Sequence, residues 1–240
     1  MTDFVLIHGA YQGGWIWKFV SERLRDAGHN VLAPTLDGCA ERAMCLRQGV
    51  TTETHGEEIA RFVYFHDLSN VVLVGTSSGG MVMAKAAEIA RERVGRIVFL
   101  DALALLDGEK IRDFVKRPAA VNTPISLGPD REDARNRLLV SLEASLGEWA
   151  ADRMTLHPQA VFNEPVKLSS FWELPWRASV VYCTGAPDPG EVHARRIQRS
   201  LRASWHTIDT GHYPMLSAPD AVVSILLSEP SSHRSPPWVD

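Results

Sequence analysis

The 240-residue sequence contains few cysteines, and they are not spaced as a metal site or a disulfide framework requires. Cys39, Cys45 and Cys183 are its three cysteines, and no CxxC pair occurs. An odd number of widely separated cysteines argues against a disulfide-stabilised scaffold and against a structural zinc site. We therefore expect buried or unreactive thiols, and we expect neither a metal nor another cofactor.

The sequence also lacks an excess of positive charge and a long apolar run. Its 25 Lys and Arg residues face 29 Asp and Glu residues, and it has no basic run of the kind that nucleic acid or an anionic membrane requires. No apolar stretch approaches the roughly 18 residues that span a bilayer, and no signal-peptide pattern precedes the strand-like FVLIHG of residues 4–9. We expect a cytoplasmic protein that binds a small molecule rather than nucleic acid or membrane. The oligomeric state stays open, a homodimer included.

Short apolar segments alternate with helical ones along much of the chain. Strand-like segments occur at residues 4–7, 30–33, 71–74, 97–100, 180–183 and 205–208. Helical spacing or composition occurs at residues 15–27, 57–65 and 81–93. This alternation predicts an α/β fold in which helices cover both faces of a mostly parallel sheet.

Residues 107–175 break this alternation with charged helical stretches that several prolines interrupt. We interpret them as a helical cap inserted before the penultimate strand. The core would then comprise residues 1–106 and 176–229. The Pro- and Ser-rich residues 230–240 would form a flexible tail.

The most informative segment is VVLVGTSSGG, residues 71–80. It places Gly75-x-Ser77-x-Gly79 directly after an apolar strand and directly before a helix. In that context the pattern predicts a sharp turn that lifts the serine hydroxyl above the sheet edge as a nucleophile. A phosphate-binding turn is less consistent with the sequence, because GK[ST] and GxGxxG are absent and the turn follows the third strand.

A nucleophilic serine needs donors for the oxyanion that forms during its attack. One donor is expected to be the backbone N–H after the nucleophile, at Ser78. The other is expected from the turn after the first strand, for which Ala10 is our candidate, and Gly9 would let that backbone approach the substrate.

His212 is the candidate base, in the IDTGHYP segment that follows the last strand. A loop histidine there can reach over the sheet to Ser77, in the chain order serine, acid, histidine. Other histidines are better interpreted as surface or capping residues: His55, His66, His157, His193 and His206.

Two aspartates compete for the acid. Asp188 follows the penultimate strand, the common position, although it could instead shape a proline-rich turn. Asp101 ends the buried strand at residues 97–100, where an unpaired carboxylate would cost several kcal/mol and therefore needs a partner. That partner could be an imidazolium or nearby backbone amides. Both assignments stay open, with a small preference for Asp101.

Five segments together resemble the plant methylesterase and hydroxynitrile lyase group of the α/β-hydrolase superfamily: HGAYQGGWIW (8–17), APTLDGCAER (33–42), GTSSGG (75–80), FLDALALLDG (99–108) and TGH (210–212). They are more similar still to bacterial esterases related to that group. The resemblance runs from residue 4 to about 227 and is weakest in the cap. It implies the α/β-hydrolase fold, catalytic Ser77 and His212, and an oxyanion hole at Ala10 and Ser78.

For the acidic residue that would orient His212, the resemblance supports both candidates, Asp188 and Asp101. Methylesterases and lyases carry the acid after the penultimate strand, which implies Asp188. Related haloalkane dehalogenases carry it after the strand that follows the nucleophile helix, which implies Asp101. Bacterial relatives often lack an acid in the later loop, which also keeps Asp101 in contention.

Two departures from the lyases bear on the reaction. Those enzymes carry Thr after the histidine of the oxyanion strand and Lys after the catalytic histidine, whereas this chain has Gly9 and Tyr213. Without that lysine, no cation is evident to stabilise departing cyanide. An esterase is therefore favoured over a lyase.

The expected substrate is a small or aromatic, uncharged ester. This expectation depends on aromatic residues of the cap and of the oxyanion turn, namely Phe162, Phe171, Trp172, Trp176, Tyr11 and Trp15. Candidate binding residues are Gly9, Tyr11, Trp15, Trp172 and Tyr213. An amidase or lactonase using the same residues stays open, as does a receptor of this fold with little turnover.

Overall fold

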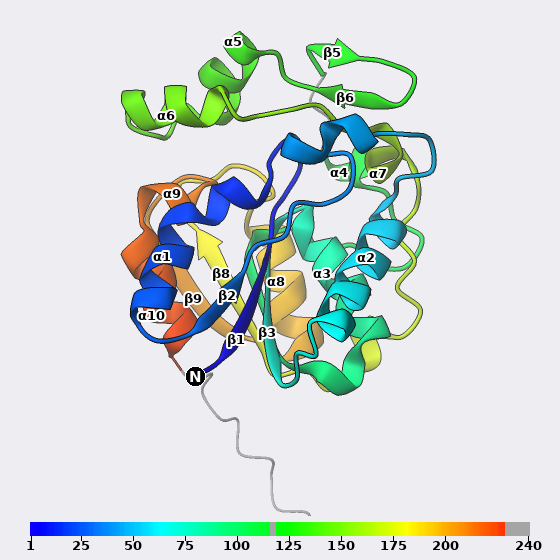
Figure 1. Cartoon of the computed structure of the whole chain (residues 1–240), viewed down its shortest axis with the longest axis vertical. Coiled ribbons are helices and arrows are strands. Elements are labelled where there is room, and N and C mark those ends of the chain that lie inside the picture. The colour runs from blue at the N-terminus through cyan, green and yellow to red at the C-terminus, as the bar shows by residue number, and fades with distance from the viewer. Residues whose placement is uncertain (116–118, 229–240) are drawn as a thin grey trace, which may run out of the picture.

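Six strands form a parallel sheet at the centre of the computed structural model, which describes residues 1–115 and 119–228 (Figure 1). Their spatial order is β2-β1-β3-β4-β8-β9, and every neighbouring pair is parallel. The strands are β1 (Asp3–Ile7), β2 (Asn30–Leu32), β3 (Val71–Ser77), β4 (Val94–Ala102), β8 (Ala178–Cys183) and β9 (Ser204–Ile208). The predicted mostly parallel sheet is confirmed.

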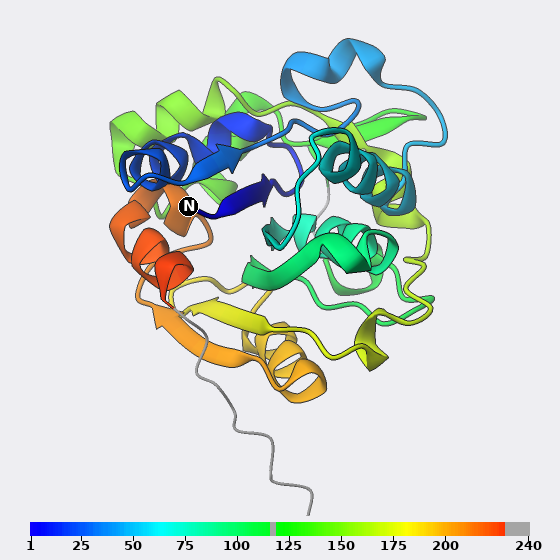
Figure 2. The same ribbon diagram turned by 60° about the horizontal axis from the view of Figure 1, so that its bottom comes forward.

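Alternate side chains of each strand enter two different hydrophobic cores. Val5 and Ile7 of β1 pack on one face of the sheet, whereas Phe4 and Leu6 pack on the other. Two groups of helices cover these faces (Figure 2). One group is α2 (Thr52–Phe65), α3 (Gly79–Ile89) and α8 (Glu191–Leu201), and the other is α1 (Lys18–Asp26), α9 (Pro214–Ser217) and α10 (Pro219–Leu227). Burial on both faces explains why the strands read as continuous apolar runs.

Two helices begin earlier than their apolar pattern indicated. Helix α2 begins at Thr52 because the Thr51 hydroxyl accepts from the Thr54 backbone N–H and the Thr54 hydroxyl accepts from the Thr51 N–H. Helix α3 begins at Gly79, two residues after the end of β3. The early start of α3 brings its N-terminal end directly beside Ser77.

The segment between β4 and β8 is more mixed than the charged helical pattern predicted. Its helices are α4 (Ile111–Phe114), α5 (Arg131–Asp133), α6 (Ala144–Ala151) and α7 (Gln159–Asn163). Its strands β5 (Val121–Asn122), β6 (Ser126–Gly128) and β7 (His157–Pro158) form a small antiparallel sheet. Figure 1 shows α4, α5, α6, α7, β5 and β6 above the end of the sheet at which β1 finishes. The predicted tail at 230–240 lies outside the described residues.

The three cysteines are free thiols, with Cys39 and Cys183 buried and Cys45 exposed. Burial raises the pKa of the Cys39 thiol to about 12 and raises that of Cys183 as well, so both stay protonated. Within the described part of the chain, no helix is long and apolar enough to cross a membrane.

Candidate active site

Ser77 lies at the sharp turn between β3 and α3, in a strained backbone conformation with φ +53°. The turn is tight because the flanking glycines leave no room for a side chain. A Cβ on Gly75 would lie 2.7 Å from the Gly79 carbonyl oxygen, and one on Gly79 would lie 2.3 Å from the His8 carbonyl oxygen. These close approaches explain why glycine is required on both sides of Ser77.

His212 follows β9 and is oriented by a carboxylate. Its Nδ1 lies 2.6 Å from Oδ2 of Asp101, and the Cys183 backbone N–H donates to Oδ1 of the same carboxylate at 3.2 Å. An ionised carboxylate only accepts, so this hydrogen bond assigns the proton of a neutral His212 ring to Nδ1 and leaves Nε2 unprotonated. Asp101 has a buried side chain and a strained backbone with φ +44°. Both of its oxygens therefore have a partner despite their burial.

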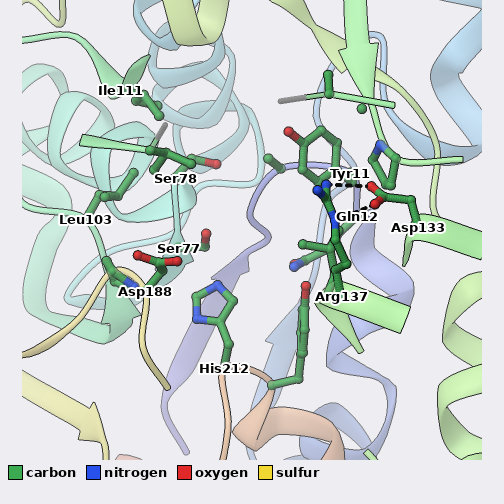
Figure 3. Close-up of a pocket in the computed structure, with 18 of the residues that line it drawn as sticks. Tyr11, Gln12, Ser77, Ser78, Leu103, Ile111, Asp133, Arg137, Asp188 and His212 are labelled. Carbon is green, nitrogen blue, oxygen red and sulfur yellow. Dashed lines mark hydrogen bonds and ion pairs between the residues drawn. The ribbon is translucent and has the colours of Figure 1, made fainter. Parts of the chain in front are cut away.

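Asp188, the other candidate acid, lies in the loop between β8 and α8 and lines the same cavity as Ser77 and His212 (Figure 3). The hydrogen bond that orients the imidazole through Nδ1 goes to Asp101. The structure thus brings Asp101 to His212 and leaves Asp188 on the cavity wall.

The two candidate oxyanion donors, Ala10 and Ser78, both line this cavity. Ala10 belongs to the turn after β1, and Ser78 precedes α3. Gly9 lies against Ser77, since a Cβ on it would be 2.6 Å from Ser77 Cβ and 3.3 Å from Ser77 Oγ. Any side chain at position 9 would therefore displace Ser77 or the turn.

The cavity beside Ser77 has a volume of about 380 Å³. Leu103 and Ile111 lie on one side of Ser77, and Gln12, Asp133 and Arg137 lie on the other (Figure 3). Arg137 donates to Asp133 at 2.8 Å between Nη2 and Oδ2, so the charges on this polar side are paired. None of these five residues was singled out from the sequence. Ile111, Asp133 and Arg137 lie outside the recognisable motifs, and Gln12 and Leu103 lie within motifs without a predicted role.

The expected binding residues separate into two groups. Tyr11 and Tyr213 line the cavity, and Tyr11 stacks on Phe162 with ring centroids 5.9 Å apart. Trp15 instead packs edge-on against Trp149 in the core beneath α1. Trp172, together with Phe171 and Trp176, packs against the opposite core, and its Nε1 donates to the Leu105 carbonyl oxygen. Aromatic composition alone could not distinguish cavity walls from core.

The interpretation of the other histidines as surface or capping residues was wrong for three of them. His55, His157 and His193 are buried. Each ring can be buried because a nitrogen has a partner: the Asp37 carbonyl oxygen for His55, Cys39 Sγ for His157 and the Ala104 N–H for His193. His66 is exposed at the end of α2, as predicted.

Burial favours the neutral form of three clustered imidazoles, those of His8, His55 and His157. It lowers the pKa of His8 to about 4, lowers that of His55, and lowers that of His157 well below 6.5. His55 and His157 lie together, with ring centroids 6.0 Å apart, and their charges would repel each other. Protonating any of them in the folded state would place a charge in a buried environment.

We expect folding stability to fall as the pH drops from about 6.5 towards 4. The folded-state pKa values lie below the unfolded value near 6.5, so the unfolded chain takes up protons first. Stability is therefore complete above that pH and is lost below it. A histidine whose folded-state pKa lies below a given pH makes the unfolding free energy fall by about 1.4 kcal/mol per pH unit there, provided its unfolded form is protonated. Urea unfolding at pH values from 7.5 to 4.5 measures the slope of the unfolding free energy against pH.

A His157→Phe variant should show a shallower slope than the wild type, because one buried titrating group is gone. His66→Phe is the matched control at an exposed position and should keep the wild-type slope. Equal slopes in all three proteins would contradict a contribution from His157.

Comparison with known proteins identifies relatives over most of the chain. Residues 4–225 match the model of the alpha/beta hydrolase family. A carbendazim hydrolyzing esterase of Nocardioides is 39% identical over 111 residues, which are 46% of this chain and 46% of that protein. An alpha-hydroxynitrile lyase of Arabidopsis thaliana is 33% identical over 100 residues, 41% of this chain and 39% of that protein. The matched stretch is thus less than half the length of these relatives.

Solved structures extend the likeness beyond those stretches. The crystal structure of a methylesterase from Arabidopsis superposes with a TM-score of 0.77, covering 95% of this chain and 98% of that chain at 18% identity. At 18% identity this match shows a shared fold and nothing beyond the fold. Together with the family model, these relatives confirm the resemblance to methylesterases, hydroxynitrile lyases and a bacterial esterase.

Proposed function

Because this chain belongs to the alpha/beta hydrolase family, we propose that it is a serine esterase that cleaves small, uncharged carboxylic esters. One observation carries the proposal most directly. Ser77, at a strained turn, and His212, whose Nδ1 is held by Asp101, line the same cavity of about 380 Å³. Relatives that are named esterases support the choice of ester over other carbonyl substrates.

The proposed mechanism is acyl transfer through a covalent intermediate. Nε2 of His212 removes the Ser77 proton while Oγ attacks the ester carbonyl carbon, and the Ala10 and Ser78 amides donate to the oxyanion. The imidazolium then protonates the leaving alcohol. Water, deprotonated by the same Nε2, releases the acid and restores Ser77. Asp101 keeps the proton on Nδ1 and stabilises the imidazolium.

The cavity supports an uncharged substrate of modest size. Its apolar side, at Leu103 and Ile111, suits an alkyl or aryl group, and its polar side contains Arg137 and Asp133 already paired with each other. A charged substrate would have to compete with that ion pair and would lose hydration on the apolar side.

The test combines turnover with the position of covalent labelling. The purified chain, with chelator present, should hydrolyse p-nitrophenyl acetate and butyrate. A fluorophosphonate should abolish that activity by phosphonylating one serine, which tandem mass spectrometry of the peptide containing Ser77 and Ser78 identifies. We expect the label on Ser77.

A label on Ser78 or on any other serine of an active preparation would contradict the assignment. Cleavage of mandelonitrile without ester hydrolysis would favour a lyase instead.

A further inference from the structure

Two buried polar side chains hold the turn that carries Ala10. His8 Nδ1 donates to the Gly9 carbonyl oxygen at 2.8 Å, and its Nε2 accepts the Leu36 N–H at 3.0 Å. Gln12 Oε1 accepts the Gly9 N–H at 3.1 Å. Because a backbone N–H can only donate, this bond assigns Oε1 rather than Nε2 to the atom facing Gly9. Gln12 is 2% exposed and borders the cavity.

These bonds determine where the Ala10 N–H points. In a trans peptide the carbonyl and the following N–H point in opposite directions. The Gly9 carbonyl is directed to His8, so the Ala10 N–H of the same peptide points away from it. Gln12 fixes the preceding peptide by holding the Gly9 N–H. Gly9 is thus held on both sides, and its own N–H is occupied by Gln12 rather than offered to a substrate.

The turn after β1 requires these hydrogen bonds because its own residues do little to restrict its conformation. Gly9 has no side chain and is conformationally the freest residue type, and no side chain could be added without striking Ser77. Tyr11, two residues on, is strained with φ +67°. A flexible residue followed by a strained one would relax to other conformations if the Gly9 N–H lost its acceptor.

We propose that Gln12 is a positioning residue of the oxyanion hole, acting through its Oε1 on Gly9 and thereby on the Ala10 N–H. This inference rests on the proposed function, because it assigns Gln12 to the same oxyanion hole. It predicts that loss of the Gln12 Oε1 acceptor destabilises the transition state more than it weakens ground-state binding of the substrate.

Two substitutions separate the acceptor from the shape of the side chain. Gln12→Met keeps the length but has no oxygen, whereas Gln12→Glu keeps an oxygen that accepts the Gly9 N–H. Removing one oxyanion donor elsewhere costs about 10²- to 10³-fold in kcat, and a misdirected donor should cost part of that. We expect Gln12→Met to lower kcat about 10- to 100-fold with KM within about threefold, and Gln12→Glu to recover most of the loss.

A second readout follows the oxyanion directly. A trifluoromethyl ketone adds Ser77 Oγ to its carbonyl carbon, the serine proton passes to His212, and the ketone oxygen becomes an oxyanion. Its Ki should rise in Gln12→Met by the same factor by which kcat falls, while Ki for the product p-nitrophenol stays within about threefold. Gln48→Met makes the same change at an exposed glutamine outside the cavity and should leave all values unchanged. Retained p-nitrophenol binding shows that Gln12→Met is folded.

The inference is overturned if Gln12→Met keeps kcat and the ketone Ki within about threefold of the wild type. It is also overturned if Gln12→Glu is as impaired as Gln12→Met, because the acceptor would then not be what matters. A wild type that hydrolyses no ester and binds no trifluoromethyl ketone would instead overturn the proposed function, and this inference with it.

Discussion

Replacing Ser77 by alanine should lower kcat for p-nitrophenyl butyrate by about 10⁴- to 10⁶-fold, the range seen when a triad nucleophile is removed from a serine hydrolase. Without Oγ no acyl-enzyme can form, and the remaining amides and imidazole can only assist direct attack by water. The side chain lies at the cavity surface, half-buried at the end of β3, so its loss should leave the fold intact. Steady-state kinetics and a thermal melt of the same preparation measure both effects.

The matched control is Ser69→Ala, which removes an exposed hydroxyl before β3 and should leave kcat unchanged. Activity of Ser77→Ala within tenfold of the wild type, in a preparation that melts like the wild type, would contradict Ser77 as the nucleophile.

Replacing Asp101 by asparagine should lower kcat about 10⁴-fold. The reason lies in the two hydrogen bonds of this carboxylate. The Cys183 N–H requires an acceptor, so the asparagine oxygen must face it and the amide NH₂ must face His212 Nδ1. Nδ1 would then have to accept, its proton would move to Nε2, and the base opposite Ser77 would be lost. Steady-state kinetics on the p-nitrophenyl esters measures the loss.

Asp188→Asn is the informative comparison, because the sequence left both acids open. A residue on the cavity wall that does not orient Nδ1 should cost less than tenfold in kcat, mainly through substrate contacts. The opposite ranking, with Asp188→Asn more damaging than Asp101→Asn, would assign the acid to the loop between β8 and α8.

Much of the architecture follows from local patterns in the chain. The apolar runs of β1, β3 and β4 predict buried parallel strands because neither face of such a strand meets water. The strand–GxSxG–helix order predicts the turn at Ser77, since only glycine allows strand and helix to approach so closely. The weak points were helix starts and the segment between β4 and β8. Two-residue strands such as β5 and β7 are too short to show alternation.

Relations between distant residues could not be predicted in the same way. Asp101 and His212 are 111 positions apart, and only the pairing of β4 with β8 and of β8 with β9 brings their ends together. The burial of His157 depends likewise on Cys39, 118 positions away. Neither contact could be predicted from periodicity in the sequence, because side chains that meet across a fold have no fixed spacing in the chain.

The sequence by itself determined the α/β class of fold, the family resemblance and the candidate nucleophile and base, because each depends on residues adjacent in the chain. Only the tertiary structure decided which acid meets His212, which aromatic residues line the cavity, and that Gln12 holds the β1 turn. Those outcomes depend on the register of neighbouring strands and on how loops fold back over the sheet edge. That geometry depends on residues far apart in the chain, so the composition of any one segment does not predict it.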